Sequence, residues 1–231
     1  MITDFSQREK ECFNFLKLIP SEKQYVVIGG YAVTSYGFPR FSVDLDITIP
    51  ESEISFFKKL IFDSGFVFTK RKEDLMYSGK FERYKKNLVS IDLLINGVVV
   101  RQTGYCYPFQ YIFKNSRIKE TSGWDPTNKV KSRIATKEML IALKIHSMRM
   151  SDKRDIIMLC YEKPNTKTII NHLKNSSKEK INKHIDELLA LLNDSNLKDS
   201  LKGVYSINDK LYDRAIKKCQ QTMNDVKNQL F

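Results

Sequence analysis

Three aspartates in two strand-like segments have the spacing of a cation site. Asp44 and Asp46 stand two positions apart in Ser42–Ile49, where polar and apolar residues alternate. Because residues i and i+2 of a strand point to the same face, both carboxylates project from one side. Two neighbouring carboxylates repel each other unless a cation lies between them, and oxygen ligands suit Mg²⁺. The pair therefore predicts a site for Mg²⁺ or Mn²⁺.

A third carboxylate, Asp92, lies within the apolar segment Leu88–Ile95. An acid in such a segment is costly to bury unless it is exposed at a site or bound to a metal. If the two segments are neighbouring strands, three acids converge, as a two-metal phosphoryl-transfer centre requires. We therefore expect Asp44, Asp46 and Asp92 to be catalytic and to bind metal.

Two adjacent glycines, Gly29 and Gly30, follow the β-branched segment Tyr25–Ile28 and open what we expect to be a short helix. Glycine lets the backbone approach a phosphate closely, and the N–H groups at a helix start attract an anion. Taken alone, the pair also fits an ordinary turn from a strand to a helix. The sequence contains neither a Walker A nor a GxGxxG pattern, which argues against a P-loop ATPase or a Rossmann dehydrogenase.

The elements that must position these residues change in character along the chain. In the first half we expect helices at residues 4–18, 31–37 and 52–62, and strands at 25–30, 42–49, 66–69, 81–84 and 88–95. From about Thr136 the pattern is helical, at residues 137–150, 153–162, 178–192 and 208–230. The polar region at 115–135 separates the two halves. We therefore expect a mixed α/β catalytic domain at 1–125 and an all-helical domain at 126–231 that completes the site.

Composition limits the class of protein and of partner. The 231 residues include 39 Lys and Arg against 27 Asp and Glu, a formal net charge of +12, which suits RNA, DNA or a nucleoside triphosphate. No apolar stretch approaches the roughly 20 residues that cross a bilayer, and the first residues lack a signal-peptide pattern. The four cysteines are far apart and form no CxxC pair. We expect a cytoplasmic protein without a membrane partner, a disulfide framework or a zinc ribbon.

The segment Ile28–Ile47 resembles the first motif of the nucleotidyltransferase (polymerase beta-like) superfamily, in particular its AbiEii-like toxin branch. That motif is an apolar strand, Gly-Gly or Gly-Ser, a short helix, a Gly-x-x-Arg-x-Ser/Thr stretch and then Asp-x-Asp. This sequence supplies the motif with Gly29, Gly30, Gly37, Arg40, Ser42, Asp44 and Asp46, and Asp92 matches the third acid of many members. Gly30 stands where other members have Ser, so a contact through that hydroxyl is absent.

The later segment Leu140–Leu159 is similar to the branch's second and third motifs, a helical Lys followed by Asp-x-x-Asp. The resemblance places Lys144, Asp152 and Asp155 in the site, with Lys144 facing the triphosphate. Two structural explanations compete with it. Lys144 on an apolar helix could extend its ammonium to solvent, and Asp152 could be a helix N-cap with Asp155 at N3. The resemblance covers about residues 25–160, and the helices after 165 match nothing that we can name.

The resemblance implies a fold and a reaction. The fold is a nucleotidyltransferase-like mixed sheet with flanking helices, followed by an all-helical C-terminal domain that closes over nucleotide and acceptor. The reaction moves a nucleoside monophosphate from an NTP to an acceptor hydroxyl, with Mg²⁺ or Mn²⁺ as cofactor and pyrophosphate as product. Gly29, Gly30, Arg40, Ser42 and Lys144 would bind the nucleotide, although Arg40 fits pairing with a carboxylate equally well. In the toxin branch the acceptor can be the 3′ end of tRNA, and an antitoxin protein neutralises the enzyme.

The sequence does not identify the acceptor of the nucleoside monophosphate. The positive charge favours RNA, and the basic run Lys70–Lys72 with Arg83, Lys85 and Lys86 is a candidate patch for its backbone, or a solvated hairpin. Transfer to a small molecule, as in antibiotic nucleotidyltransferases, and transfer to a Tyr, Ser or Thr hydroxyl of a protein are alternatives. A catalytically silent module of the same fold, which binds RNA or a protein partner, is a further alternative from another class.

Overall fold

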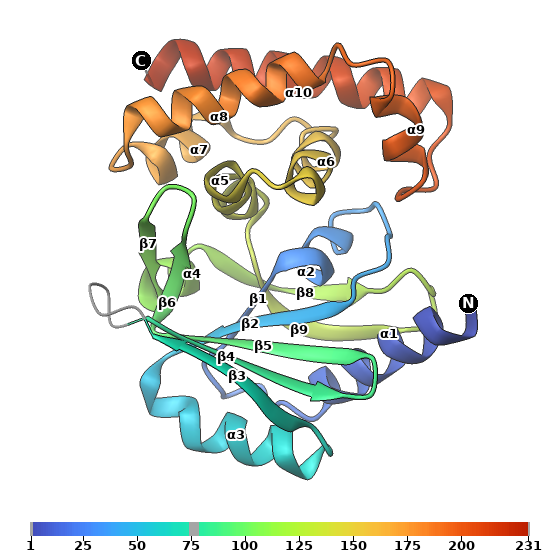
Figure 1. Ribbon diagram of the computed structural model, residues 1–231, viewed down its shortest axis with the longest axis vertical. Helices are drawn as coiled ribbons and strands as arrows, with labels where there is room; N and C mark the ends of the chain where they lie inside the picture. Colours follow the sequence, from blue (N-terminus) through green and yellow to red (C-terminus); the bar gives the residue numbers. More distant parts are fainter. Residues whose placement is uncertain (1, 74–78, 231) are drawn as a thin grey trace. The chain divides into compact units, whose positions relative to one another are not determined.

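A mixed β-sheet in the first half of the chain carries the three aspartates (Figure 1). The computed structural model describes residues 2–73 and 79–230. Within them seven strands pair in the order β3-β4-β5-β2-β1-β9-β8. The strands are β1 Val26–Ile28, β2 Asp44–Ile49, β3 Val67–Glu73, β4 Lys80–Lys86, β5 Val89–Ile95, β8 Ser116–Ser122 and β9 Lys129–Ala135. The expected mixed α/β architecture is therefore confirmed.

The register of the central strands aligns the candidate residues in a row. Strands β2 and β5 are parallel neighbours, and Asp46 lies opposite Asp92. Strand β4 runs antiparallel to β5 on its other side, and Arg83 lies opposite Asp92. Because residues directly opposite each other in a sheet share a face, Asp46, Asp92 and Arg83 project from the same side. The alternate β2 residues Leu45 and Ile47 are fully buried, which holds this register.

Helices cover the sheet on both sides (Figure 1). Helix α1 (Ile2–Lys17) and helix α3 (Ile54–Asp63, after the 3₁₀ turn η1 Glu51–Glu53) lie on one face of the sheet, and their partners on β4 alternate with Arg83, so this face is opposite to the aspartates. Ion pairs from Lys86 to Glu11 and from Lys58 to Glu82 join these helices to β4. The short helix α2 (Gly29–Thr34) follows β1 directly and lies on the aspartate side.

The structure adds elements that the sequence pattern does not show. Strands β6 (Gly97–Val100) and β7 (Tyr105–Pro108) form a separate two-stranded pair, and helix α4 (Phe109–Lys114) follows. Strands β8 and β9 occupy most of the region that we expected to be a linker. One compact unit therefore comprises Met1–Val99 and Cys106–Thr136, so the division falls after Thr136 and not after residue 125. The reason is that β9 pairs with β1 inside the sheet, at Val27 and Ile134.

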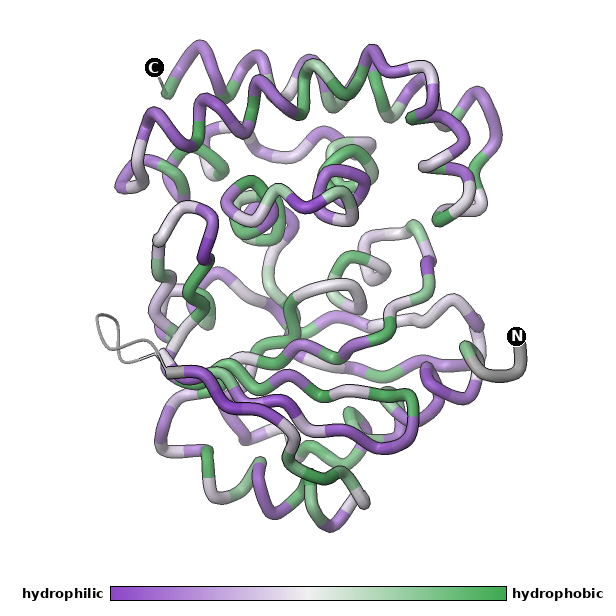
Figure 2. The backbone as a smooth tube through the Cα atoms, in the orientation of Figure 1, coloured by the Kyte–Doolittle hydropathy of each residue, from purple (hydrophilic) through white to green (hydrophobic). Residues whose placement is uncertain are grey.

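The second compact unit, Val100–Tyr105 with Lys137–Phe231, is helical after the first segment, as expected. Its helices are α5 Lys137–Ser147, α6 Met150–Leu159, α7 Thr166–Leu173, α8 Lys178–Leu191, α9 Leu197–Lys202 and α10 Asp209–Leu230. Figure 2 shows hydrophilic and hydrophobic residues alternating along α10, whose buried stripe includes Cys219, Met223 and Val226. None of the helices in the described part of the chain has the length and hydropathy needed to cross a bilayer.

Candidate functional site

The glycine turn packs directly against the Asp-x-Asp strand. Gly29 has a φ of +67°, and a Cβ added to it would lie 1.9 Å from Oδ2 of Asp46. A Cβ on Gly30 would lie 2.2 Å from Oγ of Ser42 and 3.0 Å from Nη2 of Arg40. Neither position has room for a side chain, so glycine is required by contact at both and by conformation at Gly29. The structure thus brings together five of the seven residues of the first motif.

Asp92 is held by an arginine that the motif does not include. Arg83 donates from Nε to Oδ1 of Asp92 and from Nη2 to Oδ2, both at 2.6 Å. Its Nη2 also lies 3.4 Å from Oδ2 of Asp44. The Asp92 side chain is 5% exposed and that of Arg83 is 31% exposed, so the guanidinium lies over the carboxylate on the solvent side. The fork geometry is that of a strong, charge-assisted bidentate pair.

The electrostatics of this pair follow from burial and contact. Burial raises the pKa of the Asp92 carboxyl above its ordinary value, while the hydrogen bonds and charge of Arg83 oppose that rise. The hydrogen bonds to Asp92 raise the pKa of the Arg83 guanidinium above its already high ordinary value. Arg83 therefore stays protonated, and its positive charge is fixed among the aspartates.

The expected cluster of three metal-binding acids is only partly formed. The strand register does bring Asp92 beside Asp46, but the described residues contain no group of three or more His, Cys, Asp or Glu side chains placed to hold a metal ion. Mg²⁺ is usually held by one or two carboxylates together with substrate phosphates and water. Asp44 and Asp46 fit one divalent cation in that manner. Asp92 does not fit as a further ligand while both of its oxygens accept from Arg83.

Lys144, Asp152 and Asp155 form a buried ion cluster inside the helical unit. The Lys144 Nζ atom lies 3.0 Å from Oδ1 of Asp152 and 2.6 Å from Oδ2 of Asp155. Tyr205 donates its hydroxyl to Asp155 at 2.5 Å, and Arg149 donates Nε to Asp152 at 2.7 Å. Burial alone would raise the pKa of Asp152, but Lys144 and Arg149 outweigh it and lower the pKa to about 2. The three predicted residues thus meet, and with Arg149 the cluster has two positive and two negative charges.

Both structural explanations for this segment need correction. The Lys144 side chain is only 7% exposed, so it does not extend its ammonium to solvent. Arg149 is the N-cap of α6 and Asp152 stands at N3, where its Oδ2 accepts from the Arg149 backbone N–H. The acid therefore lies one turn further into the helix than an N-cap.

The sequence interpretation missed Arg83 as a site residue and Tyr205 altogether. It placed Arg83 only in a basic patch with Lys70–Lys72, Lys85 and Lys86. The strand pairing divides that patch between the faces of the sheet: Lys70, Lys72, Arg83 and Lys85 share the aspartate face, whereas Arg71 and Lys86 lie on the other. The two on the far face form ion pairs with Glu82 and Glu11.

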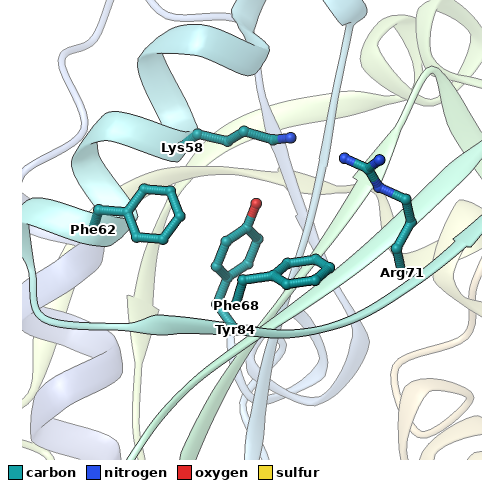
Figure 3. A pocket seen from close by; sticks show the side chains of 5 residues that line it. All are labelled: Lys58, Phe62, Phe68, Arg71 and Tyr84. Atoms are coloured by element: carbon teal, nitrogen blue, oxygen red, sulfur yellow. The ribbon is translucent and has the colours of Figure 1, made fainter.

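A pocket lies on that far face, between α3 and strands β3 and β4 (Figure 3). Its volume is about 470 Å³, and its lining consists of Lys58, Phe62, Phe68, Arg71 and Tyr84. The buried Glu82 accepts from Lys58 at 3.0 Å, from Arg71 at 2.6 Å and from Tyr84 at 2.5 Å. The polar groups of Lys58, Arg71 and Tyr84 at the edge of the pocket thus hydrogen-bond to Glu82. The sheet separates the pocket from the aspartates.

Known proteins give limited guidance. Neither a protein-family model nor a curated protein sequence matches the chain. Over 99% of its length the chain is similar in structure to a protein from H. pylori that is provisionally described as a nucleotidyltransferase, with 16% identity, 95% coverage of that chain and a TM-score of 0.49. A STING-associated CdnE c-di-GMP synthase from Capnocytophaga granulosa shows 14% identity over 99% of this chain and 81% of its own, with a TM-score of 0.24. Both TM-scores are below 0.5, so neither likeness assigns a family or an activity.

Proposed function

We propose that this chain is a nucleotidyltransferase, which moves a nucleoside monophosphate from an NTP to an acceptor hydroxyl and releases pyrophosphate. The observation that carries the proposal is the contact between the glycine turn and the Asp-x-Asp strand, where Gly29 has no room for a Cβ beside Asp46. Glycine lets the Asp46 carboxylate lie directly against the turn, so the backbone that would border the phosphates is next to two carboxylates suited to a cation.

The residues of the sheet divide the chemical work in this proposal. Asp44 and Asp46 hold a divalent cation, which when bound supplies positive charge to the phosphoryl oxygens. The backbone at Gly29 and Gly30 borders the phosphates, and Arg40 beside Gly30 adds a guanidinium suited to a phosphate oxygen. Ser42 donates its hydroxyl to the backbone oxygen of Asp44 at 3.3 Å, which helps to fix the start of the strand.

The residues of the helical unit are a separate part of the proposal. Lys144, Asp152 and Asp155 are expected at the site on the strength of the motif resemblance, with one of the acids as a base for the acceptor hydroxyl. Inside the helical unit their charges already pair at 2.6 to 3.0 Å. A role in transfer therefore requires a substrate group to compete with these bonds.

RNA is the acceptor that we favour, with the 3′ end of tRNA as the example that the resemblance supplies. The support is the net charge of +12 and the four basic residues on the aspartate face, Lys70, Lys72, Arg83 and Lys85. A toxin role, with an antitoxin protein as partner, rests on the resemblance alone.

The test is a labelling experiment with the full chain. Purified protein is incubated with Mg²⁺, total tRNA and each of the four α-³²P-labelled NTPs, beside an Asp44→Ala/Asp46→Ala variant and a control, Glu120→Gln, at an exposed acid of β8. We expect label on tRNA with one nucleotide, lost only in the aspartate variant. Label on the protein would make a side chain the acceptor, and NTP binding without label would indicate a small-molecule acceptor. Absence of NTP binding would contradict the proposal and favour the alternative of a catalytically silent module.

A further inference from the structure

A single row of charged side chains crosses three neighbouring strands on the aspartate face. Asp46 of β2, Asp92 of β5 and Arg83 of β4 are direct register partners, in that order. Neighbouring strands are about 4.8 Å apart, so side chains of this length can contact each other along the row. Nη2 of Arg83 also lies 3.4 Å from Oδ2 of Asp44, so the guanidinium contacts two of the three aspartates, Asp44 and Asp92.

The charges of this row differ from those of a three-acid centre. Asp44, Asp46 and Asp92 without an arginine would present three negative charges, which calls for more than one divalent cation. With both of its oxygens bonded to Arg83, the Asp92 carboxylate is already neutralised, and the acids placed for a divalent cation are Asp44 and Asp46. The bidentate bonds at 2.6 Å occupy the two oxygens with which Asp92 would bind a metal ion.

We propose that the site binds one divalent cation, on Asp44 and Asp46, and that the Arg83 guanidinium takes the place of a second cation on Asp92. This inference rests on the proposed function. Asp92 is then a positioning residue, because it fixes Arg83 and does not itself bind metal. Asp92 takes up the Nε and Nη2 edge of the guanidinium, and the N–H groups of Nη1 can pair with a phosphate oxygen, so the ligand is a phosphate group of the nucleotide substrate.

The alternative is an ordinary cross-strand ion pair that only stabilises the sheet. The two explanations differ in what happens when the arginine is removed. Asp92 would keep its buried position but lose the group that neutralises it. If Arg83 replaces a cation, the Asp92 carboxylate that loses its arginine lies next to Asp46 and binds a second divalent cation.

The experiment counts Mn²⁺ ions by electron paramagnetic resonance of the unbound metal, without nucleotide. We expect one bound Mn²⁺ in the wild-type protein, two in Arg83→Gln and one again in Arg83→Gln/Asp92→Asn, because the neutral amide removes the second ligand. Arg83→Lys should also bind one, since the ammonium keeps the charge. The matched control is Arg71→Gln on the far face, which also loses an arginine from a buried acid but should keep one Mn²⁺.

Circular dichroism of each variant shows whether it is folded, and Arg83→Thr, which is also uncharged and suits a strand, takes the place of Arg83→Gln with the same expected count of two if Arg83→Gln does not fold. Two Mn²⁺ ions in the wild-type protein, or two in Arg83→Lys, would overturn the inference while leaving the proposed function intact. One Mn²⁺ in a folded Arg83→Gln variant would also overturn it. Absence of both Mn²⁺ and NTP binding in the wild-type protein would instead contradict the proposed function itself.

Discussion

Replacing Gly29 by alanine should displace Asp46 and so separate catalysis from stability. The added Cβ would lie 1.9 Å from Oδ2 of Asp46. To reach an ordinary contact distance of about 3.5 Å, the oxygen must move by about 1.6 Å. A misplacement of about 1 Å at a reacting centre can cost roughly a hundredfold in rate, so we expect nucleotidyl transfer to fall at least that far.

Gly29→Ala also has a free-energy cost from its backbone conformation. The same substitution at a second glycine measures this cost without the contact to Asp46. Gly29 has a φ of +67°, and alanine there costs about 1–2 kcal/mol because its Cβ approaches the next carbonyl. Gly104 has nearly the same φ, +73°, but no atom within 4 Å of an added Cβ. Gly104→Ala should therefore lose only the backbone part of the stability, about 2–8 °C in Tm, and should keep its transfer activity.

The assays are label transfer from NTP, Mn²⁺ affinity and thermal unfolding, each on Gly29→Ala, Gly104→Ala and the wild-type protein. Gly29→Ala should be the variant in which transfer and Mn²⁺ affinity both fall. Transfer within a factor of three of the wild type in a folded Gly29→Ala would refute the argument that this turn positions Asp46. An equal loss of transfer in Gly104→Ala would show that backbone strain, and not the contact, is responsible.

Three further predictions concern the acids and the buried ions. Asp46→Asn should lose transfer by more than the roughly 10²–10⁴-fold effect of general-base catalysis while circular dichroism stays unchanged, and retained activity would remove Asp46 from the site. Lys144→Met should cost about 3–5 kcal/mol in urea unfolding because it removes the ammonium that pairs with two buried carboxylates, whereas Lys153→Met, at a partly exposed pair, should cost at most about 1 kcal/mol. The pKa of Asp152 is lowered to about 2 from 3.8, so its stabilising effect is complete above pH 3.8 and is lost as the pH falls toward 2. The difference in unfolding free energy between the wild type and Asp152→Asn should shrink over that interval, and a constant difference would contradict the ion-pair assignment.

Short-range patterns made part of the fold and site predictable. Ser42–Ile49 alternates strictly, and Gly29 and Asp46 are close enough in sequence for one strand-helix-strand unit to bring them together. Strands β8 and β9 were missed because Ser116–Ser122 and Lys129–Ala135 contain many charged and hydroxyl residues and lack an apolar run. Their place in the sheet depends on the pairing of β9 with β1, which no local pattern shows.

The Arg83–Asp92 pair was within reach of the strand pattern, whereas the Lys144 cluster was expected only from the motif resemblance. Strands β4 and β5 are joined by Asn87 and Leu88 alone, and a two-residue hairpin fixes the register so that residue 83 faces residue 92. Lys144 meets its two acids only because Met148, at a φ of +50°, ends helix α5 and turns α6 back onto it. That reversal carries no strong sequence signal, since methionine is an unusual residue for a positive φ.

The pairing of β1 with β9 has a consequence for synthesis of the chain. β1 ends at Ile28, but β9, its parallel partner, is complete only at Ala135, about a hundred residues later. Until that segment leaves the ribosome, one side of a fully buried strand has no hydrogen-bond partner and forms an open edge. A fragment that stops at residue 125 would keep the two aspartates of β2 and the glycine turn but would retain this open edge, so we expect it to aggregate instead of folding as a catalytic domain.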